Sequence, residues 1–252
     1  MIFDRTKGIS EEASIAQIVN TDHRTADVFR KYGIDFCCGG KWSLKMACEM
    51  KGLDMDKIKK ELEKSVRNIC LPNTLKFEEW DIDFLTDYIT NVHHRYLKTN
   101  LPETKHYLER FVQNHEKKFL YLRDLLRIFI ELSNDMLPHL EQEENIIFPY
   151  IKQIAHAHSN KEPYAALLVR TLRKPVENVM NHETESVNSF LRQLRGLTDQ
   201  YTPPANACIS HKVIFSRMLE IDNDLVQHLY LENDILFPRA IKMEKELLEK
   251  QD

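Results

Sequence analysis

The chain has 252 residues and a formal net charge of −4, with 29% charged residues of both signs interspersed. This balance excludes a basic stripe for nucleic acid and an acidic disordered arm. No apolar run approaches the roughly 18 residues of a membrane span, and no leader is evident. The five cysteines are too few and too irregularly spaced for a disulfide framework. We therefore expect a cytoplasmic protein that binds neither membrane nor nucleic acid.

Only 6 glycines and 9 prolines are present, too few for the many turns of a β-sandwich or barrel, so the chain is predicted to be all-α. The first predicted helix spans 13–32 and ends at Gly33, which suits a left-handed C-cap. A glycine-containing loop follows. Ser43 and Asp54 are then expected to cap two further helices, the second ending near residue 67.

A linker containing Pro72 separates this small helical domain, residues 1–68, from a larger domain, residues 75–252. Because proline removes a backbone hydrogen bond from a helix interior, we expect a chain break at Leu101-Pro102 and a break or kink at Pro138. The helices predicted in the larger domain span 77–99, 103–134, 137–158, 165–196 and 207–248.

Two stretches of the larger domain are near copies of one another. His139-Leu-Glu-Gln-Glu143 recurs as His228-Leu-Tyr-Leu-Glu232, and each is followed by an apolar pair, a phenylalanine and a proline. Residues four apart share one face of a helix, with about 6 Å between their Cβ atoms. Each motif therefore points one imidazole and one carboxylate in the same direction.

The repeat extends beyond the two motifs. His94 and His182 precede them by 45 and 46 residues, so four helices would present four histidines and two glutamates. A four-helix bundle builds metal sites in this way, and ligation without thiolate suits iron or manganese, with zinc possible. A ferritin-type site needs Glu-x-x-His on two helices, but that spacing occurs only at Glu103–His106.

Two smaller expectations concern the surroundings of the site. Adjacent helical residues point about 100° apart, so only one of His93 and His94 is expected to face inward. The apolar residues that follow the motifs are expected to pack in the core and keep the site dry. They are Ile146, Phe148, Ile235 and Phe237.

His115 stands outside the repeat. The 21 residues from His94 would span about 31 Å of continuous helix, so His115 reaches the site only if the chain doubles back on both sides of it. Leu101-Pro102 offers the first turn, and the second would lie near His115–Lys118, where there is no glycine or proline. With His115 included, five imidazoles, two bridging carboxylates and one bridging oxo or hydroxo group fill eleven of the twelve positions of two octahedral metals. The open position would bind dioxygen, nitric oxide or peroxide.

The adjacent Cys37 and Cys38 allow two interpretations. A disulfide between them requires a strained eight-membered ring, so a structural bridge is not expected. The Gly39-Gly40 pair that follows exposes backbone N–H groups, which favour thiolate. The two residues are either ordinary buried thiols or groups for redox chemistry or transient iron handling.

Together these motifs resemble those of the iron–sulfur cluster repair di-iron proteins, also called repair of iron centres proteins. The family's short N-terminal domain is similar to the segment Asp35-Phe-Cys-Cys-Gly-Gly-Lys41. Its hemerythrin-like four-helix bundle is similar to the part of the chain that contains the histidine motifs and Leu236-Phe-Pro-Arg-Ala240. The resemblance implies two oxo- or hydroxo-bridged non-haem iron ions, with both glutamates bridging. It places their ligands at His94, His115, His139, Glu143, His182, His228 and Glu232.

The resemblance further implies a stress protein that helps to restore iron–sulfur clusters damaged by nitric oxide or hydrogen peroxide. Three functions remain as hypotheses. The first is non-enzymatic donation of labile iron to damaged iron–sulfur proteins, and the second is enzymatic reduction of nitric oxide. The third is a carrier or sensor of O₂, ranked last because the Cys37-Cys38 unit has no evident use there. Exposed helical faces make a homodimer plausible.

Overall fold

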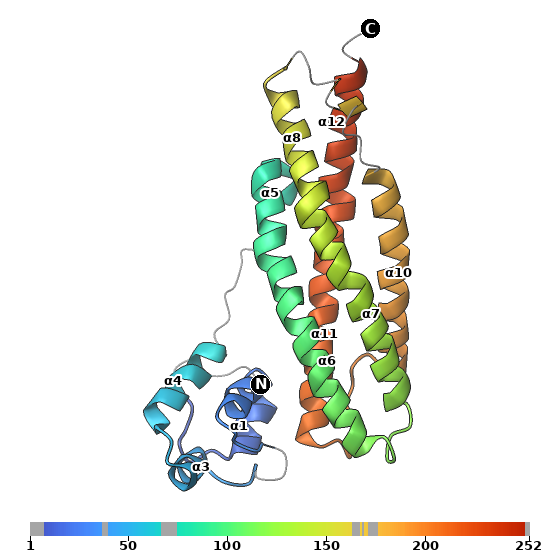
Figure 1. Cartoon of the computed structure of the whole chain (residues 1–252). Helices are drawn as coiled ribbons and strands as arrows, with labels where there is room; N and C mark the ends of the chain where they lie inside the picture. The colour runs from blue at the N-terminus through green and yellow to red at the C-terminus, as the bar shows by residue number, and fades with distance from the viewer. Residues whose placement is uncertain are drawn as a thin grey trace. The chain divides into compact units, whose positions relative to one another are not determined.

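The structure is a computed structural model that describes residues 8–36, 40–66, 75–162, 167, 169–170 and 176–249, without the side chains of 176–184. Within these ranges the chain forms helices and no strand, apart from an isolated bridge between Ser14 and Ser43. The all-α prediction is confirmed. The chain divides into two compact units (Figure 1). The first unit combines Met1–Asn73 with Tyr201–Leu219, and the second combines Thr74–Gln200 with Glu220–Asp252.

The first unit is built from short helices with side-chain caps. The predicted caps are confirmed, since Ser43 Oγ accepts the backbone N–H of Met46 at 3.2 Å and Asp54 Oδ1 accepts that of Lys57 at 3.1 Å. Its fully buried residues are Ile15, Phe29, Leu44, Ile58 and Leu62. Its helices are α1 (Ile15–Thr21), α2 (Thr25–Lys31), α3 (Leu44–Lys51), α4 (Met55–Ser65) and the first part of α11 (Ile209–Tyr230).

The single helix predicted over 13–32 is wrong, because α1 and α2 are separated at Asp22. The backbone of Asp22 is extended, with φ −149°, and its carboxylate accepts the backbone N–H of Arg24 at 3.0 Å and a guanidinium N–H of the same residue at 2.6 Å. Such local side-chain bonds compete with helix continuation. The predicted end at Gly33 is confirmed by its left-handed φ of +64°.

Gly40 is required by a close approach of two backbone segments. A Cβ atom at this position would lie 2.4 Å from the carbonyl oxygen of Phe36 and 3.0 Å from the Cβ of Ala16. The Gly40 carbonyl accepts the backbone N–H of Ala16 at 2.9 Å. Gly40 therefore lies directly against the start of α1, where a side chain would clash.

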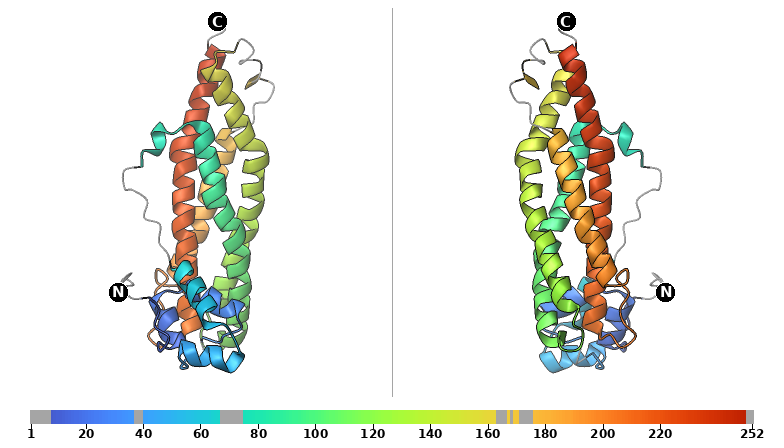
Figure 2. Two further views of the ribbon diagram at one scale, coloured as in Figure 1. Left: turned by 90° about the vertical axis from the view of Figure 1, so that its left-hand side faces the viewer. Right: turned by 90° about the vertical axis from the view of Figure 1, so that its right-hand side faces the viewer.

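The second unit is a bundle of long helices that run side by side (Figures 1 and 2). Within it α6 packs on α7, α7 on α10, α10 on α12, and α12 on α8. The chain enters through a 3₁₀ turn, η1 (Phe77–Glu79). The helices are α5 (Ile82–Tyr88), α6 (Arg95–His115), α7 (Leu122–Gln142), α8 (Phe148–Ser159), α10 (Val176–Leu197), the second part of α11, and α12 (Phe237–Glu249).

Three π-helical segments join helices of this bundle end to end. They are η2 (Ile89–His94), η3 (Glu143–Ile147) and η4 (Leu231–Leu236). In the first two an asparagine amide donates to the carbonyl four residues earlier, from Asn91 to Asp87 and from Asn145 to Glu141, both at 2.8 Å. These bonds satisfy carbonyls in turns where the α-helical pattern is interrupted.

The break predicted at Leu101-Pro102 is wrong, since α6 continues through Pro102, and α7 continues through Pro138, so the chain has a break at neither proline. A proline inside a helix costs about 3 kcal/mol. In α6 the side chains of Leu97, Leu101 and Leu108 are fully buried on either side of it. Burial of each contributes about 1.5–3 kcal/mol, which offsets that cost. Of the two reversals expected around His115, the second is present, since the chain turns after His115 in a segment without glycine or proline.

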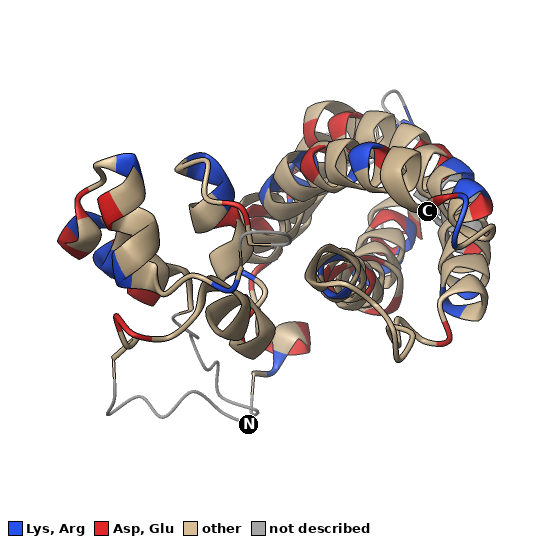
Figure 3. Cartoon of the chain, turned by 90° about the horizontal axis from the view of Figure 1, so that it is seen from below, with Lys and Arg blue, Asp and Glu red and all other residues tan. Residues whose placement is uncertain are grey.

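Seen from below, the ribbon carries Lys or Arg and Asp or Glu positions interspersed along its helices (Figure 3). This agrees with the mild net charge of −4. In the part of the chain that the structure describes, no helix has the length and apolar character to cross a lipid bilayer.

Candidate metal centre

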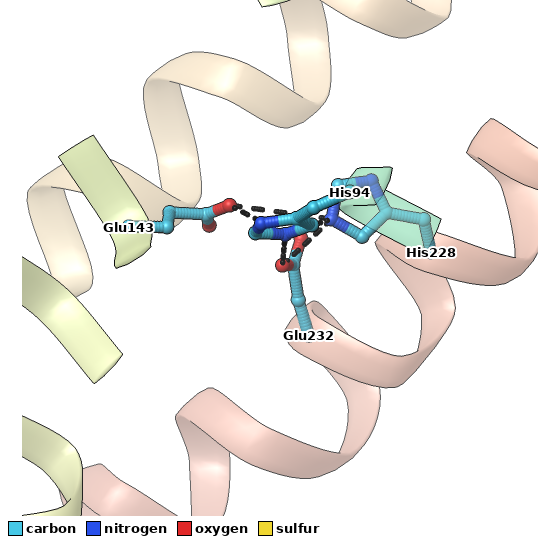
Figure 4. Close-up of side chains that lie close together, drawn as sticks. All are labelled: His94, Glu143, His228 and Glu232. Carbon is cyan, nitrogen blue, oxygen red and sulfur yellow. Dashed lines mark hydrogen bonds and ion pairs between the residues drawn. The ribbon is translucent and has the colours of Figure 1, made fainter. Parts of the chain in front are cut away.

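Among the side chains of the bundle that the structure describes, four bring their ligand atoms within 4.8 Å of one another (Figure 4). They are His94, Glu143, His228 and Glu232, and each is at most 1% exposed. His94 ends η2, Glu143 begins η3, and Glu232 lies in η4, while His228 lies in the last turn of α11. Each of the three π-helical segments therefore carries one member of the cluster, as π-turns at functional sites commonly do.

Glu143 is surrounded by imidazoles from three helical segments. Its Oε2 lies 3.2 Å from Nε2 of His139, 3.4 Å from Nε2 of His94 and 4.0 Å from Nε2 of His228. The contact with His139 is the i, i+4 pair predicted from the first motif. The other two contacts are long-range, so packing of the bundle is what makes Glu143 central.

Glu232 forms the second half of the cluster. Its Oε1 lies 2.7 Å from Nε2 of His228, the pair predicted from the second motif, and 3.5 Å from Nε2 of His94. The Nε2 atoms of His94 and His228 are only 3.2 Å apart. Figure 4 shows His94 between Glu143 on one side and Glu232 with His228 on the other.

The protonation states favour a bound cation. Burial lowers the pKa of His228 below its ordinary value, which keeps the imidazole neutral. Burial alone would raise the pKa of Glu232, but the neighbouring imidazoles of His228 and His94 outweigh it and hold that pKa well below the usual range. Neutral imidazole and ionised carboxylate are the forms that bind metals.

The donor set itself also fits a metal ion. Two imidazole nitrogens 3.2 Å apart can share at most one proton, and they face two buried carboxylates. Buried carboxylates without a compensating cation are unfavourable. A cation among these nitrogen and oxygen atoms would satisfy them together, and their chemistry suits iron, manganese or zinc.

Glu144 holds the outer nitrogen of His94, a role that sequence reasoning missed. Oε1 of Glu144 lies 3.0 Å from Nδ1 of His94, and its Oε2 accepts a hydrogen bond from Nζ of Lys98 at 2.7 Å. Burial would raise the pKa of Glu144, but Lys98 and His94 lower it overall. The ionised carboxylate accepts a hydrogen bond from Nδ1–H, which directs the lone pair of His94 at Nε2 toward the cluster.

His93 was also missed, because only one of the two adjacent histidines was expected to face inward. Both are buried. Nδ1 of His93 lies 3.0 Å from Oδ1 of Asp224, and its ring lies nearly parallel to that of His228, with 6.0 Å between the centroids. The expected 100° separation applies to an α-helix, whereas both residues belong to the π-helical η2.

The structure does not bring His115 to the cluster. With Pro102 inside α6, this helix runs unbroken from Arg95 to His115, about 30 Å at 1.5 Å per residue. His115 ends the helix, where its Nδ1 lies 3.0 Å from the carbonyl oxygen of Phe111 and its ring stacks on that of Phe111.

Some of the remaining predicted site residues lie outside the described part of the chain, and others can be compared with the structure. His182 lies on α10, but its side chain is outside the described residues, as are Cys37 and Cys38 entirely. Of the four apolar residues expected to dry the site, Phe148, Ile235 and Phe237 are buried, and the ring of Phe148 stacks on His94 with centroids 5.3 Å apart. Ile146 is 42% exposed, so the prediction for it is wrong; in η3 its neighbour Ile147 is buried instead.

Comparison with known families agrees with this architecture. Residues 87–240 match the family described as Hemerythrin HHE cation binding domain. Residues 11–66 match ScdA_N, described as a domain of unknown function, DUF542. The second unit therefore contains a hemerythrin-type cation-binding bundle, and an ScdA_N domain precedes it.

Curated relatives match nearly the whole chain. The chain is 30% identical over 227 residues to the iron-sulfur cluster repair protein YtfE of Enterobacter sp. (strain 638), covering 90% of this chain and 96% of the relative. It is 27% identical to ScdA of Staphylococcus haemolyticus (91% and 98% covered) and 30% identical to YtfE of Escherichia coli O81 (86% and 91%), both also named iron-sulfur cluster repair proteins. The chain belongs to this family of iron–sulfur cluster repair proteins.

Proposed function

We propose that this protein repairs damaged iron–sulfur clusters by donating iron from a di-iron centre in its bundle. The observation that carries the proposal is the buried cluster in which Glu143 and Glu232 each lie between imidazoles of different helices. Carboxylates in such positions suit bridging between two metal ions. The proposed ligands are His94, His139, Glu143, His182, His228 and Glu232.

The proposed ligand set omits His115, which α6 carries away from the cluster. Four imidazoles and two carboxylates would leave more than one position open on a pair of six-coordinate irons. Bound iron would supply redox chemistry and sites for small ligands. Fewer protein ligands also favour release of iron, which donation requires.

The residues around the centre prepare it for loading. Burial keeps His228 neutral, and the imidazoles keep Glu232 ionised, so both are ready to bind metal. Glu144 with Lys98 fixes the orientation of His94. The buried ring of Phe148 covers one face of His94 and limits access of water.

Metal analysis of the purified protein and of two ligand variants tests the centre. We expect about two irons per chain and absorption typical of an oxo bridge. Glu143→Leu and Glu232→Leu should lose iron and this absorption, whereas Glu141→Leu, on the exposed side of α7, should retain both. Retention of two irons by both ligand variants would refute the proposed ligands.

Iron transfer tests repair itself. Protein loaded with ⁵⁷Fe is incubated with a [4Fe–4S] protein that has lost iron, under sulfide-free and sulfide-supplemented conditions. We expect label in the rebuilt cluster and recovery of the acceptor's activity. A double Cys37→Ser, Cys38→Ser variant shows whether the two thiols assist. If the label stays on the loaded protein while the acceptor remains inactive, donation is excluded.

Nitric oxide reduction is the second candidate, favoured by the open positions that the proposed ligand set leaves. In this reaction two nitric oxide molecules, two electrons and two protons are converted to one nitrous oxide and one water molecule. Repeated turnover of nitric oxide to nitrous oxide with a chemical electron donor would support an enzyme. Stoichiometric binding without turnover would eliminate this candidate and leave donation.

A further inference from the structure

A continuous series of aromatic rings leads from the metal cluster toward the bundle surface. His93 lies nearly parallel to His228 with 6.0 Å between centroids, and Tyr88 meets His93 edge-on at 5.6 Å. Trp80 in turn meets Tyr88 edge-on at 5.2 Å. Each ring therefore lies in near contact with the next.

The series runs from a buried end to an accessible end. His228 and His93 are buried, whereas Tyr88 and Trp80 are each partly exposed. Trp80 follows η1, where Arg239 donates to its carbonyl at 2.7 Å, and its ring packs on Phe77 and on the largely exposed Phe84. These contacts hold the indole in a fixed position at the end of the series.

The order of residue types matters chemically. Tyrosine and tryptophan are the aromatic side chains that lose an electron most readily, and phenylalanine does not do so under biological conditions. Here the two oxidisable rings, Trp80 and Tyr88, are the ones that connect to the cluster.

Asp224 lies beside the middle of the series. Its Oδ1 lies 3.0 Å from Nδ1 of His93, which holds that ring in place. Burial and the Asp224 charge together raise the pKa of Tyr88, so the phenol is protonated at rest. Loss of an electron makes a phenol strongly acidic, and the proton of the partly exposed Tyr88 then passes to water.

We propose that Trp80, Tyr88 and His93 form an electron-transfer path that supplies electrons to the metal centre under attack by hydrogen peroxide. This inference rests on the proposed function, because it requires iron at the cluster. The path would protect a loaded centre from oxidative damage, since oxidising equivalents leave through the protein to the surface.

The electron balance of the step is as follows. Reduction of one hydrogen peroxide to two waters breaks the O–O bond and consumes two electrons and two protons. When the centre is already ferric, Tyr88 would supply an electron through His93 and release its phenol proton to water. Trp80 then reduces the tyrosyl radical, which recovers a proton from water, and the indole loses its own proton to water. A second pass supplies the second electron. A thiol reductant restores Trp80 each time by donating one electron and one proton, so two thiols become one disulfide for each hydrogen peroxide reduced.

Oxidation of the two tryptophans tests the path, because Trp42 is a built-in control. Trp42 is 47% exposed and has no aromatic connection to the cluster among the described residues. Ferric-loaded and zinc-loaded proteins are treated with hydrogen peroxide without a thiol. Peptide mass spectrometry then measures oxygenation of Trp42 and Trp80, and freeze-quench electron paramagnetic resonance detects tyrosyl or tryptophanyl radicals.

We expect oxygenation of Trp80 in excess of Trp42 in the iron-loaded protein only. Tyr88→Phe, which preserves the ring packing, should reduce Trp80 oxygenation to the level of the zinc-loaded protein and abolish the radical signal. Tyr230→Phe, which removes a tyrosine close to His228 in sequence but outside the path, should change neither. Iron content and circular dichroism verify that the variants are loaded and folded.

Two outcomes would overturn the inference, and they are distinguishable. If the protein holds iron but Trp80 is oxygenated no more than Trp42, or equally in Tyr88→Phe, the path is refuted while the proposed function stands. If the purified protein binds no iron, both the path and the proposed function are refuted.

Discussion

Glu144 and Asn233 occupy the same position in the two copies of the internal repeat, one residue after the cluster glutamate. Only the first copy has a carboxylate there, and that carboxylate holds Nδ1 of His94 at 3.0 Å. His94 is also the histidine that lies between the two cluster glutamates. Glu144 thus fixes the orientation of His94, and the sequence marks it as a carboxylate without a counterpart in the second copy.

Glu144→Gln is expected to weaken metal binding. Glutamine preserves size but has no charge to hold the Nδ1 proton of His94, and loss of such outer contacts lowers metal affinity about 10- to 100-fold. Competition with a chelator of known affinity measures the change. Glu141→Gln on the exposed face should have the wild-type affinity, and an unaltered affinity in Glu144→Gln would contradict the assigned role.

The metal-free protein is expected to lose stability on mild acidification. Burial holds the pKa of His228 below 6.5 in the folded state, so in the window just below 6.5 the unfolded chain binds more protons than the folded one. Stability therefore rises with pH across this window and falls as the pH drops through it. The lowered pKa of Glu232 adds a further loss below about 4.5.

Thermal unfolding midpoints of the metal-free protein, from about pH 7 down to about pH 5, measure this dependence. His228→Leu should show a shallower decline, since it removes the group whose proton uptake differs between the two states. An equal or steeper decline in that variant would contradict the assignment to His228.

At the level of helices, the positions of the π-turns explain both the site and two wrong expectations. Prolines suggested breaks, yet α6 and α7 continue through Pro102 and Pro138. The irregularities lie instead at η2, η3 and η4, which carry three of the four cluster residues. No glycine or proline lies within these turns, although Pro149 and Pro238 follow η3 and η4 by two residues. Asparagine amides bond to the carbonyl four residues earlier at η2 and η3.

Pro102→Ala is expected to stabilise the second unit. Pro102 is exposed and interior to α6, so alanine restores a backbone hydrogen bond without loss of packing, for a gain of about 1–3 kcal/mol. Chemical denaturation of the metal-free protein gives the free energy of unfolding. Glu103→Ala, the neighbouring exposed position, serves as the control and should change it little. A loss of stability in Pro102→Ala would mean that the helix ends at this proline.

For the whole molecule, the packing of the N-terminal domain involves a distant part of the chain. Residues Tyr201–Leu219 belong to the first unit. There Arg217, only 5% exposed, pairs with Asp27, and Nζ of Lys212 lies 3.5 Å from Oδ1 of Asn20. The first part of α11 is therefore stabilised by residues about two hundred positions earlier, a relation that no sequence motif indicated.

Removal of residues 1–73 is expected to destabilise the first part of α11 selectively. Without Asp27 and the rest of the first unit, the backbone of residues 209–219 should exchange hydrogen faster, because its tertiary packing is lost. The segment carrying His228 and Glu232 should keep its protection and its metal. Hydrogen-exchange mass spectrometry of the shortened and full chains distinguishes the segments. Uniform loss of protection throughout the bundle would show that the two units do not unfold separately.

Much of this protein follows from local rules. The low glycine content and periodic apolar residues indicate helices, and i, i+4 spacing alone brings His139 to Glu143 at 3.2 Å and His228 to Glu232 at 2.7 Å. Serine and aspartate caps at Ser43 and Asp54 are likewise local. These features depend on residues within one or two helical turns, so they can be recognised without knowledge of the fold.

Long-range packing settled the rest. Burial of leucines on both sides of Pro102 keeps α6 continuous, and that continuity separates His115 from the cluster while His94 stays within it. The π-turns bury both His93 and His94 and turn Ile146 outward. Such outcomes depend on the sum of many contacts between distant segments. A rule based on one proline or on residue spacing does not include these contacts. They nevertheless decide which histidines and glutamates lie together in the cluster.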